Sequence, residues 1–207
     1  ISLLHRLFLF FEWAIASWII PVILIRLLKG QSNDVMFVLD CIMQPGGALC
    51  SPLYLCIAVT FIKGYDKMQR WMKALFIVPV ITILISFTNP LHHLMYSQFS
   101  VIRSEIVFGP YILISGACNY IYLIAAIVYI LLFAFKNKTA LYWKQCTLFA
   151  LSGLCPLLIS VVATFGGIEM PISATPMSFL ATVAFCGIAI YQLHMLDITP
   201  IATKHIL

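Results

Sequence analysis

Polar side chains stand at helical spacing inside or beside long apolar runs, and hydrogen bonding to a ligand is the chemistry that they could do. Asp40 and Gln44 are four residues apart, and so are Ser115 and Asn119, which places each pair on one helix face. Such groups in a membrane helix line a pocket or bind a neighbouring helix, because lipid cannot hydrogen-bond them. The predicted ligand-binding residues are Asp40, Gln44, Thr88, Asn89, His92, His93, Ser115, Asn119 and Tyr120.

The sequence has no pattern typical of a catalytic or metal site. His92 and His93 are adjacent, so on a helix they point about 100° apart and cannot easily share one ion. The motifs H-x-x-x-H, H-E-x-x-H and G-x-S-x-G and a glycine-rich phosphate loop are absent. A retinal-binding lysine is missing from the last apolar run, since no lysine occurs between Lys144 and Lys204. We therefore expect no catalytic residue, metal or cofactor, and no enzyme activity in this chain.

The elements that must position these residues are membrane-spanning helices. The 207 residues are 63% hydrophobic and only 9% charged, with a mean hydropathy of +1.06, whereas ordinary soluble domains are roughly a quarter charged. A helix crosses the hydrocarbon core in about 20 residues. The long uncharged runs predict an all-α polytopic transmembrane helix bundle in the lipid bilayer. Its six spans are expected at about 7–28, 35–62, 72–90, 108–135, 145–166 and 173–196.

The distribution of lysine and arginine predicts the orientation. If the chain starts inside, nine of the 12 basic residues lie on the inner side and three, Arg26, Lys29 and Arg103, lie outside. The positive-inside rule then places both chain ends in the cytoplasm. We expect a multi-pass protein of the cytoplasmic (inner) membrane. Because the net charge of +5 follows from this topology, we expect no nucleic-acid partner.

Proline and glycine inside the second span predict an irregular helix. Pro45, Gly46 and Gly47 are consecutive, and backbone groups freed by a break in a membrane need a cavity or a protein partner. We expect a cavity in the outer half, between the second, third and fourth spans; a packing kink is the simpler interpretation. Pro156 and Gly153 interrupt the fifth span at a matching place, which leaves a small secondary transporter with broken helices as the alternative function.

Four segments resemble one known family, the N-terminal seven-transmembrane region of bacterial histidine kinases. They are 88–94 (TNPLHHL), Gly109-Pro110-Tyr111 with Tyr120, Thr175-Pro176, and 196–202 (LDITPIA). The resemblance implies a seven-helix sensor, here without its first helix, followed by a histidine kinase, diguanylate cyclase or other output domain after Leu207. It also implies a homodimer formed through that output domain. Ser115, Ser160 and Ser173 depart from the family pattern, which implies a different ligand chemistry.

The function that we expect is therefore a sensory domain of a bacterial signalling receptor. It would bind a small, lipophilic or peptide ligand in its outer half and transmit the signal through the last helix. Asp197 and Pro200 follow that helix without a glycine-rich linker, and Pro200 biases its neighbour toward extended geometry. We expect these two residues to form a defined bend that transmits the signal.

Overall fold

The computed structural model describes residues 2–28, 32–100, 105–137, 140–165 and 174–191. The described elements are α1 (Leu3–Leu27), α2 (Asn33–Lys63), α3 (Arg70–Ala74), α4 (Ile77–His92), β1 (Tyr96–Gln98), β2 (Val107–Phe108), α5 (Tyr111–Lys136), α6 (Ala140–Phe165) and α7 (Ala174–Tyr191). The prediction of an all-α transmembrane bundle is confirmed. Five helical stretches are long and apolar enough to cross a membrane, and α7 is a shorter apolar helix within the described chain.

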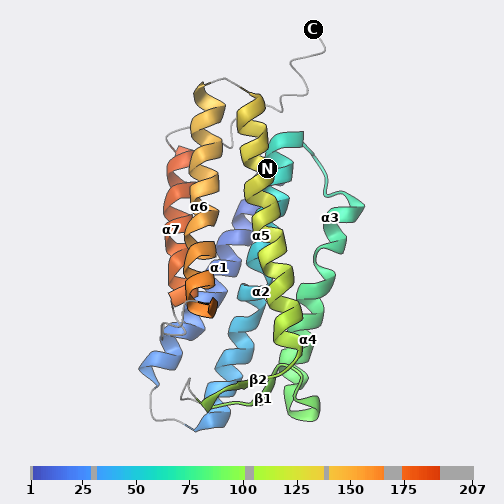
Figure 1. Cartoon of the computed structure of the whole chain (residues 1–207), viewed down its shortest axis with the longest axis vertical. Helices are drawn as coiled ribbons and strands as arrows, with labels where there is room; N and C mark the ends of the chain where they lie inside the picture. Colours follow the sequence, from blue (N-terminus) through green and yellow to red (C-terminus); the bar gives the residue numbers. More distant parts are fainter. Residues whose placement is uncertain (1, 29–31, 101–104, 138–139, 166–173, 192–207) are drawn as a thin grey trace.

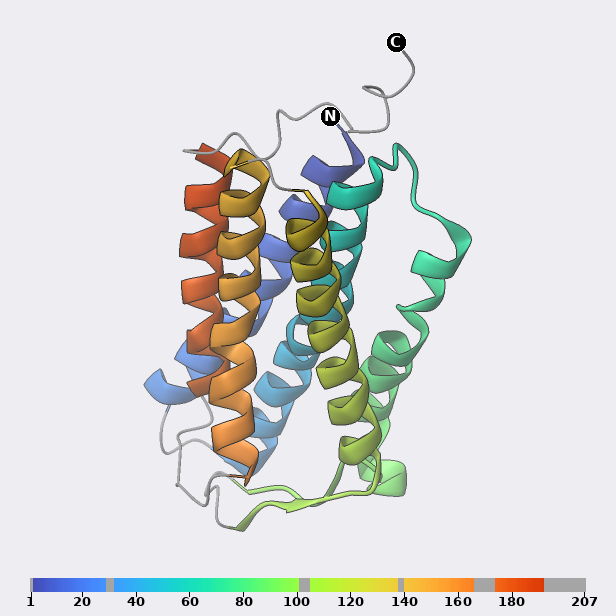
Figure 2. The ribbon, with the colours of Figure 1, turned by 45° about the horizontal axis from the view of Figure 1, so that its top comes forward.

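Helix α2 is the centre of the bundle (Figure 1). It packs against α1 along much of its length and also against α5 and α4. Helix α6 lies beside α5 and α7, and α7 returns to contact α1. Figure 2 shows the antiparallel β1–β2 hairpin crossing one end of the bundle, opposite the end at which α7 finishes. The hairpin thus forms a cap over the helices.

The third predicted span is divided into α3 and α4. The chain between them, Leu75 and Phe76, forms a turn. Pro79 lies three residues into α4, and a proline there has no N–H for the Leu75 carbonyl and would clash with it. The interruption between α3 and α4 therefore coincides with the backbone hydrogen bond that Pro79 cannot make.

Of the irregular forms expected for the second span, a break at Pro45 is wrong. Helix α2 continues from Asn33 to Lys63 through Pro45 and Pro52, because a helix flanked by packed neighbours tolerates the loss of single backbone hydrogen bonds. The glycines serve close packing instead. A Cβ atom on Gly46 would lie 2.5 Å from the Ala14 carbonyl oxygen of α1, so only glycine permits this approach of the two helices.

Large apolar side chains cover the outside of the bundle. Trp13, Leu91 and Leu113 are 72%, 84% and 74% exposed. Exposing so much apolar surface is unfavourable in water but not in the hydrocarbon of a lipid bilayer. The exposed apolar side chains and the long apolar helices together indicate that the chain is a multi-pass membrane protein in contact with the bilayer.

Candidate ligand-binding site

A cavity of about 830 Å³ lies at the hairpin end of the bundle. We call it the hairpin-end cavity. Its lining consists of Trp18, Met43, Gln44, Gly47, Ala48, Ser51, Thr82, Met95, Phe108, Ile112, Leu113, Ser115, Gly116, Ala117, Asn119, Tyr120, Leu123, Pro156, Ser160, Thr175, Pro176 and Phe179. Helices α1, α2, α4, α5, α6 and α7 all contribute, and Met95 and Phe108 belong to the cap. A volume of this size is typical of a small-molecule site.

Helical periodicity builds two of the cavity walls. Gln44 and Ser51 lie on the same face of α2 with Gly47 and Ala48 between them, the i, i+3, i+4, i+7 pattern of one helix face. On α5, Ser115 and Asn119 are one turn apart and both line the cavity. The proline-glycine segment of α2 therefore borders a cavity, although α2 is not broken there.

Four of the nine predicted ligand-binding residues line this cavity: Gln44, Ser115, Asn119 and Tyr120. The Tyr120 and Ser160 hydroxyls are 2.8 Å apart and join α5 to α6. The Ser115 hydroxyl donates to the Ile112 carbonyl at 3.2 Å, which leaves its oxygen able to accept a further hydrogen bond. Helical spacing alone had placed these groups on faces of α2 and α5.

Asp40 is buried one turn from Gln44 and does not itself line the cavity. The Gln44 amide nitrogen donates to a carboxyl oxygen of Asp40 at 3.2 Å and to the Tyr96 hydroxyl at 3.1 Å. The Tyr96 phenol is also close enough to Asp40 for the two side chains to interact electrostatically. The three side chains hold the cap against α2, and they turn the amide nitrogen of Gln44 toward protein groups.

Tyr96 was not among the predicted residues. It lies in β1, and burial raises the pKa of its phenol well above the usual value, with the nearby Asp40 adding to this shift. Its ring lies 5.5 Å from Phe99 and 5.9 Å from Phe108. The only sequence signal was its position in an aromatic stretch after the third span, and nothing local indicated that it would reach α2.

The TNPLHHL segment builds the cap and does not line the cavity. The Asn89 side-chain oxygen accepts hydrogen bonds from the Met95 and Tyr96 amides at 2.8 and 3.0 Å, and its amide donates to the Tyr96 carbonyl at 3.0 Å. His93 ends α4 in the left-handed conformation with φ 54°. This turn directs the chain into β1 and positions Tyr96 over α2.

Thr88, Asn89, His92 and His93 are thus not brought together with the other predicted residues. Thr88 and His92 bind each other at 3.0 Å, and the His92 ring accepts the Leu94 amide at 3.0 Å. Thr88 and His93 are exposed and Asn89 is buried. Sequence spacing could not show that α4 ends at His92 or that these four side chains lie outside the cavity lining.

The sequence model of one family, described as the N-terminal 7TM region of histidine kinase, matches residues 2–200. The chain belongs to this family. No curated protein and no solved structure matches it. The resemblance inferred from four short segments is thereby confirmed over nearly the whole chain, and the protein is a membrane sensory region of the histidine kinase type.

Directly beneath the cavity, this sensory region has a buried polar contact that joins three helices. The Tyr54 hydroxyl of α2 donates to the Phe149 carbonyl of α6 and lies 3.1 Å from the Ser152 hydroxyl. Thr182 of α7 donates to the Ser152 carbonyl at 2.7 Å. A Cβ atom on Gly153 would lie 2.7 Å from the Tyr54 hydroxyl, so glycine is required where the two helices meet.

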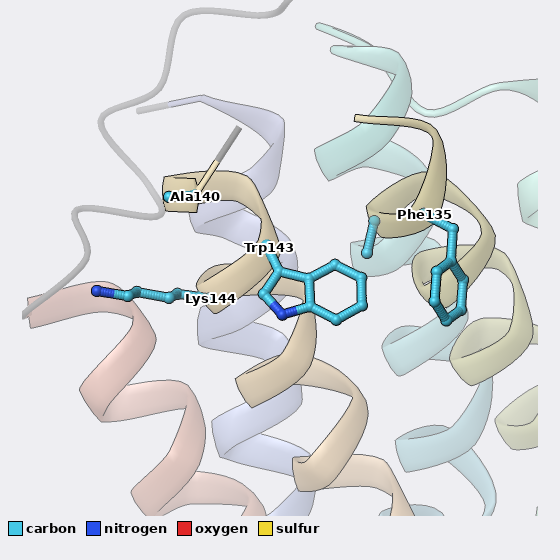
Figure 3. A pocket seen from close by; sticks show the side chains of 5 residues that line it. Phe135, Ala140, Trp143 and Lys144 are labelled. Atoms are coloured by element: carbon cyan, nitrogen blue, oxygen red, sulfur yellow. The ribbon is translucent and has the colours of Figure 1, made fainter. Parts of the chain in front are cut away.

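A second hollow of about 450 Å³ lies at the other end of the sensory region, where α5 meets α6. Figure 3 shows the Trp143 indole facing Phe135, with Lys144 extending away; the two rings are 5.3 Å apart in an edge-on arrangement. Ala134 and Ala140 complete the lining. Aromatic rings beside a lysine are typical of the membrane surface, and we do not regard this hollow as the sensory site.

Two expectations concern other parts of the chain. Asp197 and Pro200 lie outside the described residues, so the predicted bend stays a prediction. In the part of the chain that the structure describes, no group of three or more His, Cys, Asp or Glu side chains is placed to hold a metal ion.

Proposed function

We propose that this chain is the ligand-sensing membrane domain of a bacterial receptor, and that a small molecule in the hairpin-end cavity controls the position of α7. The output domain would follow in the cytoplasm and would form the homodimer. The family assignment supports a sensory role, and the cavity supplies a place for the stimulus.

One observation carries the proposal: the first two turns of α7 are part of the cavity wall. Thr175, Pro176 and Phe179 line it together with residues of α2 and α5. A ligand shifts an equilibrium only by its differential affinity for the two states. A molecule in this cavity contacts α7 directly, so any change of α7 relative to α2 and α5 changes the contacts of that molecule.

The distribution of basic residues supports an outward-facing cavity. Arg6, Lys63 and Arg70 stand at or near helix ends remote from the hairpin, and Lys136 and Lys144 flank the connection from α5 to α6 at that same end. The positive-inside rule assigns that end to the cytoplasm. The hairpin cap would then face the outside of the cytoplasmic membrane, and the chain beyond α7 would enter the cytoplasm.

The transporter alternative loses its main support. It required broken helices at matching positions, but α2 runs through Pro45 and α6 runs through Pro156 without interruption. No other feature of the described residues favours transport over sensing.

The test fills the cavity in the full-length receptor and measures its output. A Cβ atom on Gly116 would meet nothing within 4 Å, so Gly116→Phe adds a ring to the cavity without a backbone clash. We expect basal output to change by at least about fivefold, the lower end of ordinary allosteric coupling. Ile114→Phe is the control, because Ile114 lies on the same helix, is 56% exposed and is not part of the cavity lining. Equal output from wild type and Gly116→Phe at equal expression would contradict the proposal.

A further inference from the structure

The lining of the hairpin-end cavity indicates the chemical class of its occupant. We propose that the cavity binds an uncharged, elongated amphiphile, with an apolar chain and one or two hydrogen-bonding groups such as a hydroxyl, ketone or amide. This inference rests on the proposed sensory function and adds the class of ligand to it.

The first argument is the absence of charge. No Asp, Glu, Lys, Arg or His occurs among the described residues that line the cavity. Asp40 is the nearest acid along α2, but it is 6% exposed and faces Gln44 and Tyr96. An ionised ligand in this membrane-embedded site would lose its water without gaining a counter-ion, which is strongly unfavourable. A fatty acid anion or an alkylammonium ion therefore does not fit.

The second argument is a set of polar side chains in the cavity wall that have no hydrogen-bond partner in the part of the chain that the structure describes. Ser51 is 5% exposed and lines the cavity, yet its hydroxyl has no hydrogen-bond partner among the described residues. The same holds for the Asn119 amide and the Thr175 hydroxyl. The Gln44 nitrogen is used by Asp40 and Tyr96, which leaves the Gln44 carbonyl oxygen as an acceptor. Unpaired polar groups at membrane depth are costly, and a neutral polar ligand would satisfy them.

The third argument is shape. The α2 wall runs from Gln44 to Ser51 and the α5 wall from Ile112 to Leu123, so the cavity extends along the helices for roughly 10 to 16 Å at 1.5 Å per residue. Gly116 leaves open space along the α5 wall, since a Cβ atom there would meet nothing within 4 Å, whereas Gly47 packs closely against the Trp18 indole. A space that extends along the helices and has mostly apolar walls fits an alkyl chain better than a sugar or a folded peptide.

Leu113 and Phe108 indicate how such a molecule enters. Both line the cavity, and they are 74% and 56% exposed on the outside of the bundle. Leu113 lies in the first turn of α5, next to the cap. A molecule dissolved in the outer leaflet would meet this opening directly, and a chain with an uncharged head is the kind of molecule that partitions there.

The experiment compares three photoreactive probes with the same alkyl chain and different heads: a primary alcohol, a carboxylate and a quaternary ammonium. Each probe is cross-linked to the full-length receptor in lipid vesicles, and labelled peptides are identified by mass spectrometry. We expect the alcohol to label the α2 and α5 walls at least about tenfold more than either charged probe, a difference that corresponds to one decade in affinity. Gly116→Phe should reduce this labelling at least about fivefold, and Ile114→Phe should leave it unchanged.

A second variant tests the polar anchor without filling the cavity. Asn119→Leu keeps a side chain of similar size and removes the unpaired amide. Labelling by the alcohol should fall several-fold, while labelling by an alkane probe without a head group should stay the same or rise. Equal loss for both probes would show that the variant had merely disturbed the wall, and would contradict the assignment of Asn119 as an anchor.

The outcomes separate this inference from the proposed function. Preferred labelling of the site by a charged probe overturns the ligand class, and so does alcohol labelling that Gly116→Phe does not reduce. In either case a change of output in Gly116→Phe still supports sensing. Alcohol labelling of the cavity in a receptor whose output ignores both the alcohol and Gly116→Phe would support the ligand class and contradict the sensory function.

Discussion

Asn89 is the residue on which the cap depends. It is buried, and its side chain makes three hydrogen bonds with the backbone of Met95 and Tyr96. Asn89→Ala leaves these backbone groups without partners, and we expect the free energy of unfolding to fall by about 2 to 4 kcal/mol. Thr88→Ala, at the exposed neighbouring position, should change it by less than about 0.5 kcal/mol. Thermal unfolding in detergent would measure both, and equal melting temperatures for the two variants would contradict this role of the Asn89 side chain.

The Tyr96 phenol makes stability depend on pH in the alkaline range. Burial raises its pKa in the folded protein, so the folded state holds this proton more tightly than the unfolded state. The resulting stabilisation is complete below the unfolded pKa of about 10 and is lost as pH rises through the folded value. Melting temperature should therefore fall more steeply above about pH 10 in the wild type than in Tyr96→Phe. Parallel curves would show that the phenol does not contribute.

At the scale of helices, Tyr54 of α2 and Thr182 of α7 both make hydrogen bonds with α6. Gly153→Ala would place a methyl group against the Tyr54 ring, and we expect a loss of about 1 to 3 kcal/mol in stability with an altered basal output. Gly187→Ala is the matched control, because a Cβ atom there meets nothing within 4 Å. Its helix propensity makes it neutral or slightly stabilising. Similar melting temperatures for both variants would mean that α2 and α6 are not packed as described.

The continuation of α7 provides a second test at this scale. Asp197 and Pro200 follow it in the sequence, and a defined bend there would pass a shift of α7 to the output domain. Asp197→Ala and Pro200→Ala should change basal output and ligand response in the full receptor, while affinity for the ligand stays within about threefold, since neither residue is near the cavity in sequence. Normal responses from both variants at normal expression would eliminate the bend as a transmission element.

At the scale of the whole molecule, orientation is the property to measure. Gln98 is exposed in the cap and Lys67 is exposed near the opposite end. A membrane-impermeant maleimide should label Gln98→Cys in intact cells and Lys67→Cys only after lysis. The wild type is a suitable background, because all seven native cysteines lie within α2, α5, α6 and α7. Labelling of position 98 only after lysis would reverse the proposed topology and place the cavity on the cytoplasmic side.

Local properties of the chain sufficed to predict the class of fold. Apolar runs of about 20 residues and the clustering of Lys and Arg indicate spans and orientation without knowledge of packing. Helical spacing also placed Gln44, Ser115 and Asn119 on faces that the structure shows to border one cavity. Each of these inferences needs only the regular geometry of a single helix.

Only tertiary packing decided the rest. Ser51 and Thr175 are ordinary small polar residues in the sequence, and they become cavity groups because α2, α5 and α7 leave a space between them. The TNPLHHL segment has the residue types of a binding motif, but the left-handed turn at His93 directs Asn89 to the hairpin and Tyr96 to α2. Contacts between residues far apart in the chain depend on where helices end and how they pack against each other, and the periodicity of a single helix does not determine either.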